Sequence, residues 1–310
     1  MQKKILVALD GSVHSNNVLR YIDLIFKDLP DIHLHLLSIV PTSALPAGRE
    51  WMHEGDIMNS LSKEAGNKYR FRQKYLQQAV KQLAQSGIQE DHITTSVQLS
   101  RMAVAKDILN LARKGLYDAI LLGRRGLSKL EELMIGSVSS ELVGKSHDVP
   151  LWVLAGRVRS NKFLVPVDGS FHCLKAIDHL SHILKGNPHA EVTLFHSSAM
   201  MASDPDVSPM DFYDQWGQKW CEEHLGRPDS LFHAPKQMLI DNDFPENKIY
   251  WLHTFKGIYP SRQILRQAMI DNFGTIVLGR RGEEEKKGFF KGVSDQVLLM
   301  AEDMAVWILG

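Results

Sequence analysis

Ile5-Leu-Val-Ala-Leu-Asp-Gly-Ser12 is an apolar run that ends in an Asp-Gly-Ser turn, and it returns later in the chain as Phe163-Leu-Val-Pro-Val-Asp-Gly-Ser170. A second phrase, Leu122-Gly-Arg-Arg-Gly126, returns as Leu278-Gly-Arg-Arg-Gly282 at almost the same separation. Repetition at a fixed separation indicates a tandem duplication. The sequence therefore predicts two copies of one α/β unit, each with a glycine-bearing turn directly after an apolar strand.

The bulk composition is that of two ordinary domains. The chain has 310 residues, and Lys plus Arg and Asp plus Glu both number 36, so the formal net charge is zero. A chain without a basic balance is not expected to bind nucleic acid or an anionic membrane surface. The apolar run at the N-terminus stops at Asp10, too early for a signal peptide, and no stretch reaches the ~20 apolar residues of a membrane span. We expect a soluble, cytoplasmic protein.

Apolar periodicity predicts alternating strands and helices in both copies. In the first copy we expect strands at 5–9, 33–40, 93–99, 119–122 and 151–154, with helices between them. In the second copy the corresponding strands are 163–167, 192–196, 249–254, 275–278 and 306–309. Parallel strands joined by helices cross over right-handedly, so each copy is expected to form a doubly wound parallel sheet. The predicted domains are 1–156 and 163–310, joined by a polar linker at 157–162.

Two features of the second copy qualify this pattern. Five prolines between Met200 and Pro245 predict short, broken helices in that segment. The two cysteines, Cys173 and Cys221, have no CxxC spacing, so neither a disulfide framework nor a zinc ribbon is predicted.

The binding chemistry is predicted at the turn after the fourth strand. Gly123-Arg-Arg-Gly126 is followed by nine residues and then by Gly136-Ser137 at the start of a helix. Glycine lets the backbone approach a ligand closely, and the free N–H groups in the first turn of a helix favour a polyphosphate. Hydroxyls of Ser137 and Ser139 and the charges of Arg124 and Arg125 would add donors to phosphate oxygens.

With these motifs the chain resembles the universal stress protein family in its tandem form. Nucleotide-binding members of that family carry G-x2-G-x9-G-[ST], which Gly123, Gly126, Gly136 and Ser137 match. The resemblance implies five-stranded sheets in the order 3-2-1-4-5 and ATP, with Mg, held across the carboxyl ends of strands one and four. It implies a stress-response or regulatory role, with slow ATP hydrolysis at most.

The resemblance also implies individual contacts. Asp10 would face the adenine or the ribose, and Ala8 and Ile39 would line the adenine slot. The full cofactor-binding set that it implies in the first copy is Ala8, Asp10, Ile39, Gly123, Arg124, Arg125, Gly126, Gly136, Ser137, Val138 and Ser139.

The second copy departs from the motif after its last glycine. Val293 follows Gly292 where the motif requires Ser or Thr, and counting back from Trp307 indicates one deleted residue, so that Ser294 corresponds to Ser139. The run Glu283-Glu-Glu285 places like charge where phosphates would lie. We therefore expect ATP mainly in the first copy. A weaker second site would comprise Pro166, Asp168, Gly279, Gly282, Gly292 and Ser294.

The fifth strands predict how the two copies assemble. The segments around Trp152 and Trp307 are apolar and would be the outer strands of their sheets, where unpaired edges invite aggregation. Pairing them predicts an internal pseudo-dimer, in agreement with what the resemblance implies, and a homodimer of the whole chain is a further prediction.

Simpler roles stay open for most of these residues. Asp10, Asp168 and Ser137 also suit helix capping without any ligand, the arginine pairs suit solvated loops, and His14, His172 and His196 suit structural roles because no metal-ligand spacing accompanies them. A scaffold that oligomerises and binds a protein partner without nucleotide is the alternative function. An adenylating enzyme is disfavoured because neither an SGGxDS nor an HxGH signature is present.

Overall fold

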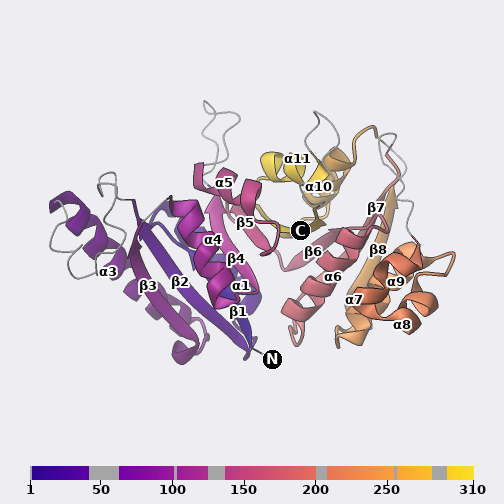
Figure 1. The fold of residues 1–310 in the computed structure, drawn as a ribbon, viewed down its shortest axis with the longest axis horizontal. Helices are drawn as coiled ribbons and strands as arrows, with labels where there is room; N and C mark the ends of the chain where they lie inside the picture. Colours follow the sequence, from indigo (N-terminus) through magenta and orange to yellow (C-terminus); the bar gives the residue numbers. More distant parts are fainter. Residues whose placement is uncertain are drawn as a thin grey trace. The chain divides into compact units, whose positions relative to one another are not determined.

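The computed structural model describes residues 2–41, 63–100, 103–124, 137–199, 208–254, 257–280 and 292–310. Contacts divide the chain into two compact units, Met1–Leu151 and Trp152–Gly310. Each copy of the repeat forms a parallel sheet with helices packed against it (Figure 1). The α/β class predicted from the sequence is therefore confirmed.

The first copy has the strand order β3-β2-β1-β4-β5, which confirms the predicted order 3-2-1-4-5. The central strand β1 pairs in parallel with β2 and with β4, so its carboxyl end lies between two other strand ends. Its elements are β1 (Lys3–Ala8), α1 (Val13–Phe26), β2 (Ile32–Val40), α3 (Lys63–Gln85), a 3-10 turn (Glu90–His92), β3 (Ile93–Leu99), α4 (Val104–Gly115), β4 (Ala119–Arg124), α5 (Ser137–Lys145) and β5 (Leu151–Ala155).

The second copy repeats the order as β8-β7-β6-β9-β10. Its elements are β6 (Lys162–Pro166), α6 (Phe171–Leu184), β7 (Glu191–Ser197), a 3-10 turn (Pro209–Phe212), α7 (Tyr213–Trp216), α8 (Gln218–His224), α9 (Ser230–Asp241), a further 3-10 turn (Glu246–Lys248), β8 (Ile249–Thr254), α10 (Pro260–Ile270), β9 (Thr275–Gly279), α11 (Val293–Met300) and β10 (Met304–Leu309).

Two features differ most clearly from the sequence prediction. Helices α7 and α8 are short, as expected, but α9 runs for 12 residues through Pro235, so the prediction of broken helices is wrong there. The Pro235 ring is buried, and its packing offsets the backbone hydrogen bond that proline cannot donate. Strand β4 continues past Leu122 to Arg124, which is only 3% exposed. Arg124 is thus a buried strand residue and not a solvated loop charge.

An aromatic cluster fills the core of the unit Trp152–Gly310. Trp152 and Trp307 are fully buried, and their rings stack with centroids 3.9 Å apart and an interplanar angle of 9°. His179 of α6 lies edge-on to both indoles, 5.8 Å from Trp152 and 6.1 Å from Trp307. These three rings make a packed group that offers His179 almost no solvation.

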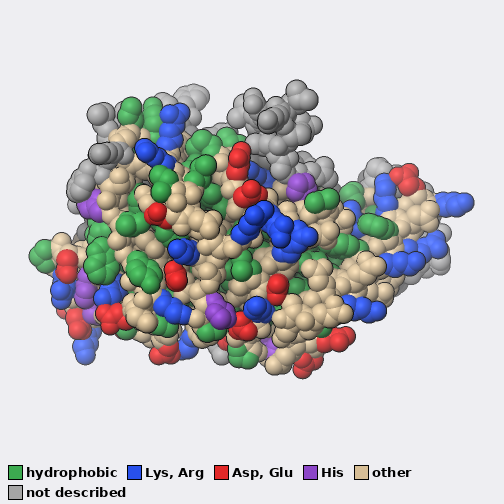
Figure 2. All heavy atoms as spheres, turned by 180° about the vertical axis from the view of Figure 1, so that it is seen from behind, with side chains coloured by type: hydrophobic (Ala, Val, Ile, Leu, Met, Phe, Trp, Pro, Cys, Tyr) green, Lys and Arg blue, Asp and Glu red, His purple; other side chains and the backbone are tan. Residues whose placement is uncertain are grey.

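The surface in Figure 2 carries basic and acidic side chains near one another among polar and apolar ones. This distribution agrees with the zero formal charge of the chain. Among the residues that the structure describes, no helix is both long enough and apolar enough to cross a membrane.

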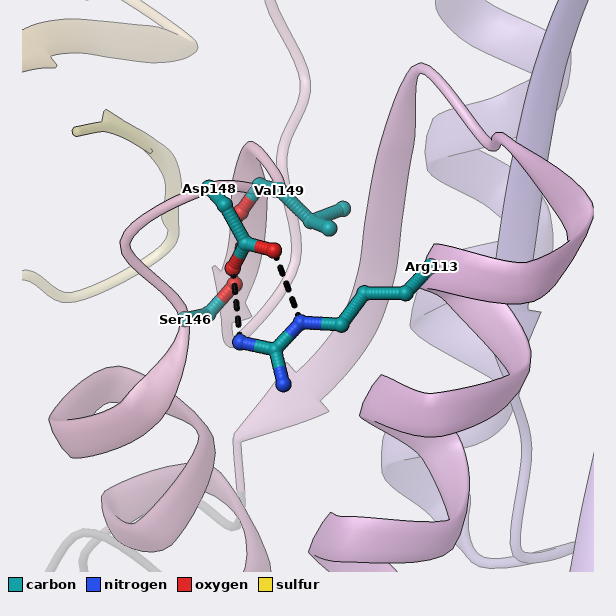
Figure 3. Close-up of polar contacts among 4 residues, drawn as sticks. All are labelled: Arg113, Ser146, Asp148 and Val149. Carbon is teal, nitrogen blue, oxygen red and sulfur yellow. Dashed lines mark hydrogen bonds and ion pairs between the residues drawn. The ribbon is translucent and has the colours of Figure 1, made fainter.

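A two-pronged ion pair ties the end of α4 to the segment before β5 (Figure 3). Arg113 donates from Nε to Oδ2 of Asp148 at 2.7 Å and from Nη2 to Oδ1 at 2.8 Å. The Ser146 hydroxyl donates to the Val149 carbonyl at 2.6 Å and holds the same turn. Both charged side chains are about half exposed, 44% for Arg113 and 53% for Asp148, so solvent screens the pair.

Replacing Arg113 with alanine is expected to lower the free energy of unfolding by at most about 1 kcal/mol, as measured by urea denaturation at pH 7. The hydrogen bonds and charge of Arg113 hold the pKa of Asp148 below its ordinary value. The contribution is therefore present above the unfolded-state pKa of about 4 and shrinks as the pH falls below it. A difference between wild type and Arg113→Ala that grows on acidification would contradict this assignment.

Candidate functional site

A cavity of about 160 Å³ opens at the carboxyl ends of β1 and β4 in the first copy. Its walls come from the end of β1 and the following turn, the neighbouring strand β2, one face of α4, the end of β4 and the first turn of α5. The lining residues are Ala8, Leu9, Asp10, Ser12, His14, Ser15, Leu37, Ile39, Val104, Ile108, Leu122, Gly123, Val138 and Ser139.

The Asp-Gly-Ser turn at the cavity floor is held by the Asp10 carboxylate. Its Oδ1 accepts hydrogen bonds from the Ser12 N–H at 3.0 Å and from the Ser15 hydroxyl at 2.8 Å. Gly11 has φ +69°, a conformation that favours glycine, and a Cβ there would lie 3.0 Å from the Phe71 ring. Asp10 thus shapes the turn and lines the cavity at once, whereas the N-cap of α1 is Ser12, so Asp10 is not the helix cap that the sequence also suggested.

Asp10 is ionised in this setting. Burial alone would raise its pKa, but the hydroxyl and N–H of Ser12, the hydroxyl of Ser15 and the charge of Arg72 together lower the pKa below its ordinary value. From α3, Tyr75 donates to Oδ1 of Asn16 at 3.0 Å, and burial raises the pKa of Tyr75 to about 12. Among the residues that line the cavity, the Asp10 carboxylate thus lies beside the hydroxyls of Ser12 and Ser15.

Gly123 has a packing role that requires no ligand. A Cβ on this residue would lie 3.0 Å from the His14 carbonyl oxygen at the start of α1. Gly279 in the second copy approaches the His172 carbonyl even more closely. The first glycine of each motif is therefore needed for the close contact between the fourth strand and the first helix.

The structure brings together six of the residues predicted for the first site, namely Ala8, Asp10, Ile39, Gly123, Val138 and Ser139. Ser137 is the first residue of α5, and Arg124 is buried at the end of β4. Arg125, Gly126 and Gly136 lie outside the described residues.

Sequence reasoning missed several lining residues, among them Ser12, Ser15, Leu37, Val104 and Ile108. Some left a signal. Leu37 pairs with Ala8 in the sheet register, and Val104 and Ile108 stand four residues apart on one face of α4. Nothing in the local sequence indicated that Ser12 and Ser15 would both line this cavity.

The second copy builds its first turn differently. Oδ1 of Asp168 accepts from the Ser170 N–H at 3.0 Å, as Asp10 does in the first copy. However, the Ser170 hydroxyl accepts from the Cys173 N–H at 3.2 Å and caps α6, whereas Ser12 makes no side-chain cap on α1.

The other residues of the predicted weaker site are only partly described. Pro166 is the last residue of β6, and Gly279 is the last residue of β9. Gly292 is the N-cap of α11, and Ser294 is buried in the first turn of that helix. Gly282 and the run 283–285 lie outside the described residues.

Comparison with known proteins agrees with this architecture. A model of the universal stress protein family matches residues 1–154. The chain is similar to universal stress protein YxiE of Bacillus subtilis, with 32% identity over 149 residues that make up 46% of this chain and 92% of that protein. Universal stress protein MJ0531 of Methanocaldococcus jannaschii is 25% identical over 149 residues, 47% of this chain and 79% of that protein.

Likeness in fold extends over both copies. The crystal structure of a universal stress protein from Archaeoglobus fulgidus covers 99% of this chain and 97% of its own, with a TM-score of 0.63 at 18% identity. The identity to YxiE, over nearly all of that protein, and the shared fold lead to one conclusion. This chain belongs to the universal stress protein family.

Proposed function

We propose that the first copy binds an adenine nucleotide, ATP with Mg, in the cavity between β1 and β4, and that the protein acts as an ATP-binding regulator in a stress response. The observation that supports this most is the cavity itself. It joins the ionised Asp10, the apolar Ile39 and the buried Ser139 at the carboxyl ends of adjacent parallel strands. In open α/β sheets this edge is where ligands bind.

Charge determines the orientation of the nucleotide. An ionised Asp10 accepts hydrogen bonds from ribose hydroxyls or from the adenine amino group, but it repels phosphates. The apolar side chains of Ile39, Val104 and Ile108 suit a flat base. The phosphates would then lie at the other end of the cavity, where Val138 and Ser139 belong to the first turn of α5.

Cavity size supports only part of the nucleotide. The described residues enclose about 160 Å³, whereas small-molecule sites are typically about 300–1,000 Å³. We assign most of this volume to the base and the sugar. The phosphates would begin at the first turn of α5 and extend out of the enclosed part.

Calorimetric titration of nucleotide-free protein with Mg-ATP tests the proposal. Wild type is expected to show one site, and Ser139→Ala is expected to weaken it about 10-fold or more, because a hydrogen bond to a charged phosphate is lost. Ser294→Ala, the matched change in the second copy, should leave the affinity unchanged. Gly123→Val is a poor probe because its side chain would press on the His14 backbone. Absence of any binding heat with wild type would favour the nucleotide-independent scaffold.

A further inference from the structure

Ser15 and Cys173 hold the same place in the two copies, five residues after the aspartate of the Asp-Gly-Ser turn. Both are buried in the first turn of the helix that follows, α1 in the first copy and α6 in the second. Ser15 also lines the cavity of the first copy. A hydroxyl is a good donor and acceptor of hydrogen bonds, whereas a thiol is a weak one. This buried position therefore carries different chemistry in the two copies.

Ser15 makes two hydrogen bonds with Asp10, one in each direction. Its hydroxyl donates to Oδ1 of Asp10 at 2.8 Å, and its oxygen accepts from the N–H of Asp10 at 2.9 Å. The Ser12 N–H donates to the same Oδ1 at 3.0 Å. One donor belongs to the turn and the other to α1, so together they give the carboxylate a preferred orientation at the edge of the cavity.

The second copy uses its buried side chain differently. The Cys173 thiol donates to the carbonyl oxygen of Pro166, with Sγ 3.6 Å from that oxygen. The N–H of Cys173 donates to the Ser170 hydroxyl at 3.2 Å and so completes the cap of α6. Ser12 makes no such cap on α1. The helix start of the second copy is thus held by a backbone cap, whereas Ser15 connects that of the first copy to the Asp10 carboxylate.

We infer that Ser15 is a positioning residue of the nucleotide site, because its hydroxyl sets the orientation in which the Asp10 carboxylate meets the ribose or the adenine amino group. The inference rests on the proposed function of the first copy. Ser15 acts through Asp10 and need not touch the nucleotide. A carboxylate that is already oriented loses little rotamer freedom when the ligand binds, and such preorganisation raises affinity. A cysteine at this position donates too weakly to have the same effect.

The same hydrogen bonds keep Asp10 ionised. Burial raises the pKa of Asp10, but the hydrogen bonds of the Asp-Gly-Ser turn, that of Ser15 and the charge of Arg72 bring the pKa below its ordinary value. The other titratable groups around the turn are Tyr75, whose pKa of about 12 keeps it neutral, and His14, which lines the same cavity. Without the Ser15 hydroxyl the effect of burial is less opposed, so Asp10 takes up its proton at a higher pH.

Calorimetric titration of the full-length chain with Mg-ATP tests this role. Ser15→Ala and the nearly isosteric Ser15→Cys, which installs the residue of the second copy, are expected to bind about 10-fold more weakly than wild type at pH 7. Ser15→Thr keeps the hydroxyl and should bind within about 3-fold of wild type. Cys173→Ser, the matched change in the second copy, should leave the affinity unchanged. Thermal unfolding of each variant shows that it is folded.

A second measurement needs no ligand. Carbon NMR of the aspartate carboxyls follows Asp10 during acid titration, and its pKa is expected to rise by about 1 in Ser15→Ala and to stay near the wild-type value in Ser15→Thr. An unchanged pKa of Asp10 in Ser15→Ala would overturn the inference, and so would wild-type affinity in both Ser15→Ala and Ser15→Cys. The two failures are distinguishable. Wild type that binds no Mg-ATP contradicts the proposed function, while the pKa of Asp10 still decides whether Ser15 controls the carboxylate.

Discussion

The Trp152→Lys variant is expected to lose more than about 4 kcal/mol of unfolding free energy, because removing a buried tryptophan alone costs about 3–5 kcal/mol and the lysine adds a buried charge. Trp152 is fully buried, its ring stacks on Trp307, and His179 lies edge-on beside it. Thermal unfolding should show a fall of the melting temperature by roughly 10 °C or more.

Two controls separate packing from charge in this experiment. Trp152→Phe keeps an apolar ring and should lose clearly less stability than the lysine variant. Trp251→Lys changes a tryptophan of β8 that is 61% exposed, so its melting temperature should stay close to that of wild type. A Trp152→Lys variant with the melting temperature of wild type would show that the stacked tryptophan pair does not contribute to stability.

Acidification from pH 7 to pH 5 is expected to destabilise wild type by about 2 kcal/mol more than a His179→Leu variant. Burial, with a smaller effect from the charge of His182, lowers the pKa of His179 to about 3. The unfolded chain binds this proton near pH 6.5, while the folded protein binds it only near pH 3. Stability is therefore independent of this group above about pH 6.5 and falls by about 1.4 kcal/mol per unit as the pH drops toward 3.

Urea denaturation of both proteins at pH 7, 6 and 5 measures this slope. Other titrating groups act equally in wild type and variant, so the difference between the two isolates His179. His189→Leu, at an exposed position, should follow the wild-type curve. Parallel curves for wild type and His179→Leu would show that the ring is solvated well enough to take up a proton in the folded state.

The strands and the two Asp-Gly-Ser turns could be predicted because their causes are local, whereas the strand order came from the resemblance to the family. A short apolar run predicts a buried strand. The positive φ at Gly11 and Gly169 favours glycine at the same position in both copies. The end of β4 could not be predicted in this way. Glycine and arginine disfavour a strand by local propensity, yet burial among neighbours keeps Arg124 in it. Likewise Pro235 continues α9 because its ring finds a buried place.

The candidate site likewise combines residues that the local sequence predicted with contacts that it could not predict. Motif spacing predicted Gly123, and the helix start that follows the motif predicted Ser139; both line the cavity. The contact of Arg72 and Tyr75 with the turn after β1 depends on how a largely polar helix, distant in sequence, packs across that turn. The pair between Arg280 and Asp295 joins residues that are distant in the sequence, and no local pattern marks a single aspartate as the partner of Arg280.

Helix α11 begins one residue before its buried serine, whereas α5 begins two residues before its own. The deletion therefore shortened the solvent side of the helix start and left the face that packs on the sheet intact. The start of a helix can thus change in one copy of a duplicated unit while the buried positions of that helix stay the same. The two copies are free to diverge in what they bind while selection for a stable core continues to act equally on both.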